Sequence, residues 1–182
     1  MTKLASKDNE LLTKTAEVVF SEVHRDAPIG HLPPARQVFV RIYTGQAIID
    51  NGSLPYFFGS DFPDAPDYSL ISDAYRAIGA EDVAGYLEAA VALFPFPAPH
   101  LDLEARKEYV QKHCSDYKGE MCELGDRIIA ESDRVFSLLA GYVRKHTSEF
   151  STPNERPALD GGTGVGLQSG HQRPGSEAGR SA

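Results

Sequence analysis

The sequence predicts an all-α protein: a compact multi-helix single domain over residues 1–150, followed by a disordered tail over residues 151–182. Three observations support this prediction. Apolar residues recur at helical spacing in successive segments of the first 150 residues, no two alternating segments flank a hairpin turn, and the composition changes sharply after residue 150. With 182 residues, of which 41% are hydrophobic, the chain can bury a core without disulfide bonds.

The first expected helix covers residues 8–25, which carry an apolar stripe at helical spacing. Asp8 or Asn9 can cap its free backbone amides, because both side chains accept hydrogen bonds at helix starts. Pro28 then ends this helix, since proline does not continue a helix that has already begun.

The second segment covers residues 34–50, and its pattern is ambiguous. Val38, Val40 and Ile42 alternate as in a strand, whereas Val38 and Ile42 also step as in a helix. The length of the segment and the proline at its start favour a helix, because proline is well suited to a first helical position. We expect this helix to end at Asn51-Gly52.

Four further helices are predicted by the same spacing of apolar residues. One begins at Tyr68 and is closed by Gly79, and the next follows it and is broken by Pro95. Another covers residues 101–113. The last covers residues 133–145, where basic residues at the C-terminal end suit the helix dipole.

Residues 151–182 differ from the rest of the chain in composition. They hold seven of the sixteen glycines and few apolar residues, and their charges cancel. Such a segment cannot bury enough surface to offset its chain entropy, so the sequence predicts disorder. We therefore expect that removing the tail leaves the thermal stability nearly unchanged.

The overall charge excludes some classes of partner. The chain has 18 Lys and Arg against 26 Asp and Glu, for a net charge of −8 and a pI near 5.2. This disfavours direct binding to nucleic acid or to an anionic membrane, because those partners attract basic residues. No apolar run is long enough to span a membrane, the start does not resemble a signal peptide, and two cysteines make no disulfide framework. We therefore expect a cytoplasmic protein.

The sequence contains no recognisable enzyme signature. It lacks a nucleophile elbow, a zinc-protease helix and a phosphate-binding loop. Cys114 and Cys122 with His113 make no recognisable zinc pattern, and we interpret the thiols as ordinary half-buried side chains. The glycine run at 161–166 follows no predicted strand and reads as a linker. The prediction is therefore a protein that is not an enzyme and has no metal or cofactor.

The negative charge is concentrated in residues 50–104, which carry ten acidic side chains against one basic side chain, Arg76, for a net charge of −9. A field of one sign attracts a basic protein and speeds its docking. Seven carboxylates of this stretch are the candidate partner-binding residues, and we expect them to converge on one exposed face. They are Asp61, Asp64, Asp67, Asp73, Glu81, Asp82 and Glu88.

A structural role for the same acids is an open alternative. Asp61, Asp64 and Asp67 recur every third residue between prolines, which in polyproline II geometry places them on one edge. Asp64 and Asp67 can equally cap or line the start of the next helix, and Glu81-Asp82 can occupy the first turn of the one after it. This alternative explains individual positions but not the near absence of Lys and Arg.

The run Asn51-Gly52-Ser53-Leu54-Pro55-Tyr56-Phe57-Phe58-Gly59-Ser60 resembles the Asn-Gly-Gly-Phe-x-Gln-Phe-Phe-x-Asn signature of the DNA mimic protein family, a bacterial domain family. Residues 74–80 and 84–95 are similar to its helix–Gly-Ala–helix pair, and the resemblance extends over residues 37–150. Four positions depart from the signature, namely Ser53, Leu54, Tyr56 and Ser60.

The resemblance implies a small all-helical binding protein without catalysis, whose acidic surface imitates the charge of DNA and occupies the nucleic-acid-binding face of a basic regulator. It also implies mostly structural roles for Asn51, Gly52, Phe57, Phe58 and Gly79: Gly52 would allow a helix-terminal turn, and the two phenylalanines would anchor the next segment in the core.

Two other functions fit the same sequence. Small acidic proteins also serve as immunity proteins or antitoxins that neutralise a basic toxin such as a nuclease, and they use the same kind of surface. An enzyme without a recognisable motif is the third reading. In the first two cases the expected partner is a basic protein.

Overall fold

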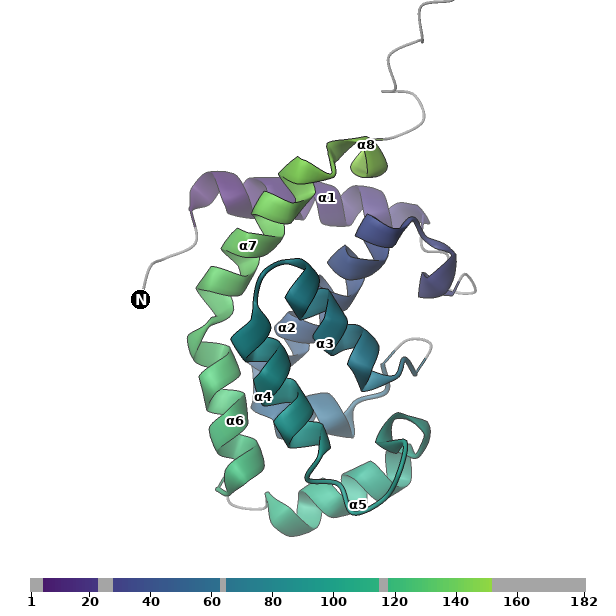
Figure 1. The fold of residues 1–182 in the computed structure, drawn as a ribbon, viewed down its shortest axis with the longest axis vertical. Coiled ribbons are helices and arrows are strands. Elements are labelled where there is room, and N and C mark those ends of the chain that lie inside the picture. Colours follow the sequence, from purple (N-terminus) through teal and green to yellow (C-terminus); the bar gives the residue numbers. More distant parts are fainter. Residues whose placement is uncertain (1–4, 23–27, 63–64, 115–117, 152–182) are drawn as a thin grey trace, which may run out of the picture.

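A computed structural model of the protein describes residues 5–22, 28–62, 65–114 and 118–151. Within these ranges the chain is helical and has no strand, which confirms the predicted all-α class. Figure 1 shows the arrangement. The helices are α1 (Ser6–Glu22), α2 (Pro34–Gly59), α3 (Tyr68–Ala77), α4 (Glu81–Val91), α5 (Leu103–His113), α6 (Glu120–Ala130), α7 (Ser132–Lys145) and α8 (Thr147–Phe150), with short 3₁₀ turns at Ile29–His31 and Pro99–Leu101.

The α2 helix is the centre of the domain and contacts α3, α5, α6 and α7. It begins at Pro34, as predicted, but it does not end at Asn51-Gly52. The backbone leaves helical geometry only at Gly52 and Ser53, and the helix then resumes to Gly59. The expected end is therefore a kink. The helix resumes because this turn buries Phe57 and Phe58 in the core, where they are 2% and 0% exposed.

Helices α3 and α4 form a hairpin that packs on α2 and α6. The turn between them is a Schellman motif: the N–H of Gly79 donates to the carbonyl of Arg76, and that of Ala80 donates to the carbonyl of Tyr75, both at 2.9 Å. Gly79 has φ = +86°, a conformation that glycine adopts without steric cost. The prediction that Gly79 closes this helix is confirmed.

The core is rich in aromatic rings. Phe58 contacts Phe57, Tyr68 and Phe94 with ring centroids 5.0–5.3 Å apart in edge-on arrangements. These contacts tie the second part of α2 to the start of α3 and to the chain that follows α4. The expected anchoring role of Phe57 and Phe58 is confirmed.

A buried amide links three helices. Gln46 is fully buried, and its Nε2 donates to Asp50 Oδ1 at 2.8 Å and to Ser132 Oγ at 2.9 Å. Its Oε1 accepts a hydrogen bond from the hydroxyl of Tyr75 at 2.9 Å. Burial raises the pKa of Tyr75, so the hydroxyl stays a neutral donor. The network fixes α2, α3 and α7 relative to one another.

Two helices are absent from the sequence predictions. The α6 helix buries Met121, Leu124 and Ile128, which lie on one face at helical spacing. The four-residue helix α8 is held by Arg36, whose Nε donates to the carbonyl of Glu149 at 2.5 Å and whose guanidinium also reaches the carbonyl of Ser151 at 3.2 Å.

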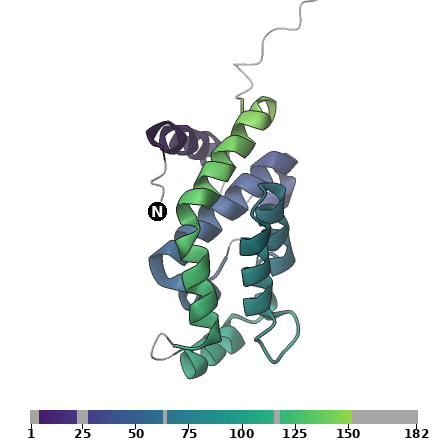
Figure 2. The same ribbon diagram turned by 60° about the vertical axis from the view of Figure 1, so that its left-hand side comes forward.

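The α1 helix lies across α7 at one end of the domain, as Figures 1 and 2 both show. It begins at Ser6, so the prediction that Asp8 or Asn9 caps it is wrong. Asp8 lies inside the first turn and pairs instead with Arg144 of α7.

Among the helices of the described residues, none combines the length and the apolar character that a membrane span requires. Residues 23–25 of the expected first helix and residues 152–182 of the expected tail lie outside the described residues.

Candidate acidic interaction surface

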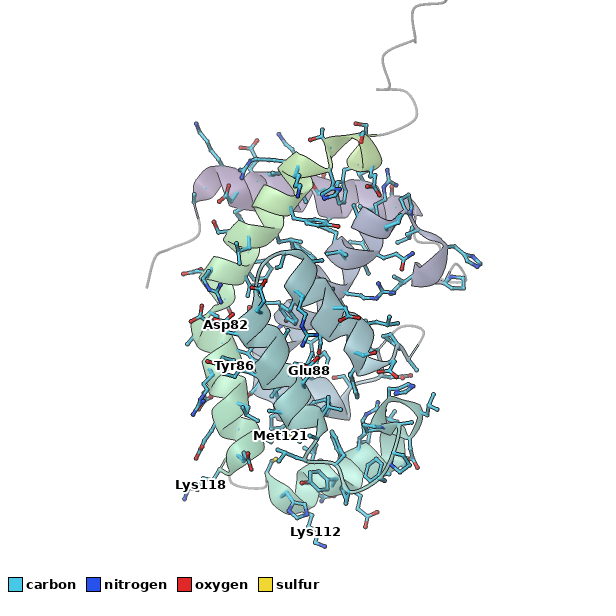
Figure 3. The ribbon with its side chains drawn as sticks, in the orientation of Figure 1. Asp82, Tyr86, Glu88, Lys112, Lys118 and Met121 are labelled. Carbon is cyan, nitrogen blue, oxygen red and sulfur yellow. The ribbon has the colours of Figure 1, made fainter. Side chains whose placement is uncertain are left out.

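Six of the seven predicted partner-binding carboxylates are described, and all six are exposed. We call them the acidic surface: Asp61, Asp67, Asp73, Glu81, Asp82 and Glu88. They lie on the segment before α3, on α3 and on α4, and the two helices pack together. Figure 3 shows two of them on α4, with Asp82 on the side of α7 and Glu88 on the side of α3. Asp64 lies outside the described residues.

Asp67 caps α3, as the structural alternative predicted. Its carboxylate accepts a hydrogen bond from the backbone N–H of Ser69 at 2.9 Å. The same hydrogen bond lowers the pKa of Asp67, because it stabilises the charged form. One oxygen is therefore engaged by the helix, but the side chain remains exposed to a partner.

Arg76 bridges two acids of the hairpin. Its guanidinium lies 2.7 Å from Glu88 Oε2 on α4 and 3.3 Å from Asp73 Oδ1 on α3. The three side chains are 42–67% exposed, so these ion pairs exchange with water and contribute little to stability. Arg76, the only Lys or Arg of residues 50–104, thus lies between two carboxylates of the same stretch.

Asp82 is paired with a residue far along the chain. Its Oδ2 lies 2.6 Å from Nη2 of Arg134, at the start of α7, and Arg134 also contacts Glu131 at 2.5 Å. Burial acts to raise the pKa of Asp82, but the hydrogen bonds from Arg134 and from the N–H of Val83 outweigh it and lower the pKa. Asp82 lies in the first turn of α4, also as the structural alternative predicted.

Asp61 and Glu81 make no ion pair with any other described residue. Of the six carboxylates, Asp73, Asp82 and Glu88 are therefore paired with arginine, while Asp61, Asp67 and Glu81 are not. Some of these carboxylates therefore stabilise helix starts, whereas others are exposed and make no ion pair, and both kinds occur on the α3–α4 hairpin.

The α6 helix adds acidic side chains next to the α3–α4 hairpin, which was not predicted from the sequence. Glu120, Glu123 and Asp126 of α6 are exposed, and α6 packs beside α4. Arg127 lies between the two helices, with its guanidinium 5.7 Å from the ring centre of Tyr86 on α4. The apolar spacing of Met121, Leu124 and Ile128 is the signal that would have revealed α6.

The buried position of Arg106 was also not predicted from the sequence. It is 3% exposed, and its guanidinium donates to the carbonyls of Phe58 at 2.9 Å, Pro99 at 2.6 Å and Ser60 at 3.2 Å. Two of these carbonyls are at the C-terminal end of α2, so Arg106 caps that helix from the side. No spacing rule distinguishes such an arginine from an exposed one.

Two positions of the motif, Asn51 and Ser53, lie at the α2 kink. Asn51 is exposed, and its amide donates to the carbonyl of Ala47 at 2.8 Å. Ser53 has φ = +61° at the kink, and its Oγ is buried without a hydrogen bond. Gly125 of α6 packs directly on this kink, where a Cβ would lie 2.0 Å from Ser53 Oγ. The kink therefore holds α2 and α6 in close contact.

The described residues contain no group of three or more His, Cys, Asp and Glu side chains arranged to hold a metal ion. The chemistry of the hairpin is that of exposed carboxylates, which accept hydrogen bonds and ion pairs from cationic side chains.

Comparison with known proteins gives one match. The family model described as DMP19-like protein matches residues 30–146, which is more than half of the chain and includes α2 to α7. No curated protein and no solved structure matches. The chain therefore belongs to the DMP19-like protein family.

Proposed function

We propose that this protein is a non-catalytic binding protein whose acidic surface occupies the nucleic-acid-binding face of a basic regulator. The observation that carries the proposal is the exposure of six carboxylates in a stretch whose net charge is −9. Membership of the DMP19-like family is consistent with this role.

The physical basis is replacement of phosphate by carboxylate. Both groups accept paired hydrogen bonds from arginine, so a surface that binds the DNA backbone also binds a suitable set of carboxylates. The net charge of −8 speeds the encounter with a cationic partner, and this effect weakens as salt rises.

The internal arginines do not block such docking. The Arg76–Glu88 and Arg134–Asp82 pairs are 41–47% exposed, and exposed pairs of this kind contribute little to stability. A partner arginine can therefore take the place of either one at small cost. Asp61 and Glu81 are available without any exchange.

The test is affinity capture from a lysate of the source organism, followed by competition with duplex DNA. The wild-type protein is compared with the double variant Asp61→Asn, Glu81→Gln. The matched control is Glu17→Gln, Glu108→Gln, which removes the same charge from exposed positions on α1 and α5. We expect a basic DNA-binding protein that is retained at about 50 mM salt, reduced at about 200 mM, and released by DNA.

The double variant of the acidic surface should retain less of this partner than the control. Equal retention by the two variants would contradict the proposed surface, and a partner that DNA does not release would contradict mimicry. Capture of a nuclease whose activity the protein suppresses would support toxin neutralisation instead.

A further inference from the structure

Three sulfur atoms meet where α5 ends and α6 begins. Cys114 follows the last residue of α5, and Met121 and Cys122 lie in the first turn of α6. All three side chains are buried, at 8%, 3% and 5% exposure. The thiol of Cys114 lies 3.8 Å from the Met121 sulfur and is close to the thiol of Cys122. Figure 3 labels Met121 at this junction.

The sulfur spacing is that of ligands around one ion. Two sulfur atoms bound to the same ion at about 2.3 Å lie about 3.8–4.0 Å apart in tetrahedral or trigonal geometry. The observed distance between Cys114 Sγ and Met121 Sδ is 3.8 Å. Cys114 and Met121 therefore need little movement to share an ion.

The ligand types select a soft ion. Two thiolates and a thioether suit Cu(I), whereas a structural zinc site needs four nitrogen, sulfur or carboxylate ligands. The neighbouring His113 is exposed, and its ring stacks on the ring of Tyr109 with the ring centroids 4.3 Å apart. His113 therefore packs against Tyr109 and is not counted among the ligands. No fourth nitrogen or carboxylate ligand joins the cluster among the described residues.

We propose that Cys114, Met121 and Cys122 form a binding site for Cu(I). Each cysteine that binds loses its thiol proton, so one ion displaces two protons and the site changes from neutral to a net charge of −1. No electron is transferred, because the copper enters and stays as Cu(I). The inference is independent of the acidic surface.

The structure also provides a route to Cys114, one of the three sulfur residues. A hollow of about 380 Å³ opens beside the α2 kink, and Cys114 forms part of its wall. Its other lining residues are Asn51, Gly52, Pro55, Tyr56, Val110 and Gln111. An ion that enters there reaches Cys114 without unfolding of the surrounding helices. Binding would join the end of α5 to the first turn of α6.

The test is an anaerobic titration of the reduced full-length protein with Cu(I), in competition with bicinchoninate as a coloured chelator. We expect one ion per chain. The double variant Cys114→Ser, Cys122→Ser should lose this binding, and Met121→Leu, which conserves volume, should weaken it about tenfold or more. The matched control His113→Gln should bind as the wild type does.

A second measurement separates binding from folding defects. Cu(I) should raise the Tm of the wild-type protein and of His113→Gln but not of the double serine variant, because a ligand of the native state stabilises it. Binding by the serine variant equal to the wild type would overturn the proposal, as would loss of binding in His113→Gln. Equal affinity of Met121→Leu and wild type would remove the thioether from the site and overturn the three-sulfur assignment.

Discussion

Replacing Ser53 by glycine should stabilise the protein. Ser53 has φ = +61° and ψ = −172°, a combination that is essentially restricted to glycine and costs other residues about 1–3 kcal/mol. Its hydroxyl is also buried without a hydrogen bond, which adds a desolvation cost of about 1–3 kcal/mol. Glycine removes both penalties and restores the second Gly of the Asn-Gly-Gly signature that the sequence resembles.

The expected gain is smaller than the sum of those costs. Glycine gives the unfolded chain more freedom, which offsets about 0.4–1 kcal/mol, and neighbouring groups relax around a strained residue. A net stabilisation of about 1–3 kcal/mol is therefore expected for Ser53→Gly, which corresponds to a rise in Tm of about 3–10 °C for a domain of this size. Thermal and urea unfolding followed by circular dichroism measure it. An unchanged or lower Tm would refute the reasoning.

The contact between the kink and α6 provides a second, independent check. In Gly125→Ala the new Cβ would lie 2.0 Å from Ser53 Oγ and 3.0 Å from the backbone nitrogen of Leu54. This substitution alone should destabilise by about 1–3 kcal/mol, and less in the Ser53→Gly background, with a coupling of about 1 kcal/mol. The control Gly141→Ala on α7 has no atom within 4 Å of its Cβ and should stabilise by about 0.5–1 kcal/mol. Strict additivity of the two kink substitutions would contradict the proposed contact.

Three further predictions concern single features of the fold. Arg106→Met should destabilise by about 2–5 kcal/mol in urea unfolding, because three carbonyls lose their donor, whereas exposed Lys107→Met should change stability by less than about 0.5 kcal/mol. Asp67→Ala should cost about 1 kcal/mol through loss of the α3 cap. The pKa of Asp67 is lowered from 3.8 in the native state, so the charged carboxylate stabilises the fold above pH 3.8 and this stabilisation is lost as pH falls through the lower native value. The free energies of unfolding of the wild type and of Asp67→Asn should therefore converge in acid. A chain ending at Ser151, which keeps the carbonyl that Arg36 contacts, should unfold within about 2 °C of the full-length protein, and a larger loss would show that residues 152–182 contribute to the fold.

The helices that could be predicted are those whose apolar spacing is regular and whose ends carry a local signal. The α3 helix is the clearest case, because Gly79 marks its end and Asp67 its start. The α6 helix carries a weaker signal, because its apolar face contains only Met121, Leu124 and Ile128 among the larger side chains.

The α2 kink shows where local signals stop being sufficient. Asn51-Gly52 is a typical helix end, and the backbone does leave helical geometry there. The helix nevertheless resumes, because burying Phe57 and Phe58 favours one more turn of helix over an extended connection. That gain depends on α3 and on the chain after α4, which supply the aromatic partners, and no short stretch of sequence contains this information.

The candidate surface illustrates the same difference between composition and geometry. The net charge of −9 in residues 50–104 is visible in the sequence, and so are the helix-start positions of Asp67 and Asp82. The pairing of Asp82 with Arg134 is not, because it joins residues 52 apart along the chain. Likewise, Arg76 reaches Glu88 only because the hairpin brings α3 against α4.

A count of charges also misjudges how much positive charge a partner meets at contact distance. Residues 105–150 carry equal numbers of acidic and basic side chains. One of the basic residues, Arg106, is only 3% exposed, and its guanidinium donates hydrogen bonds to backbone carbonyls. Its charge still contributes to the long-range field, because carbonyl dipoles do not cancel a full charge. It offers no donor to a docking protein, however. The exposed acids of α6 next to α4 are therefore less compensated at the surface than the sequence balance indicates. On this basis we predict that a partner docking on the α3–α4 hairpin also contacts α6. Glu123 and Asp126 are then the next positions to neutralise if Asp61→Asn, Glu81→Gln weakens binding without abolishing it.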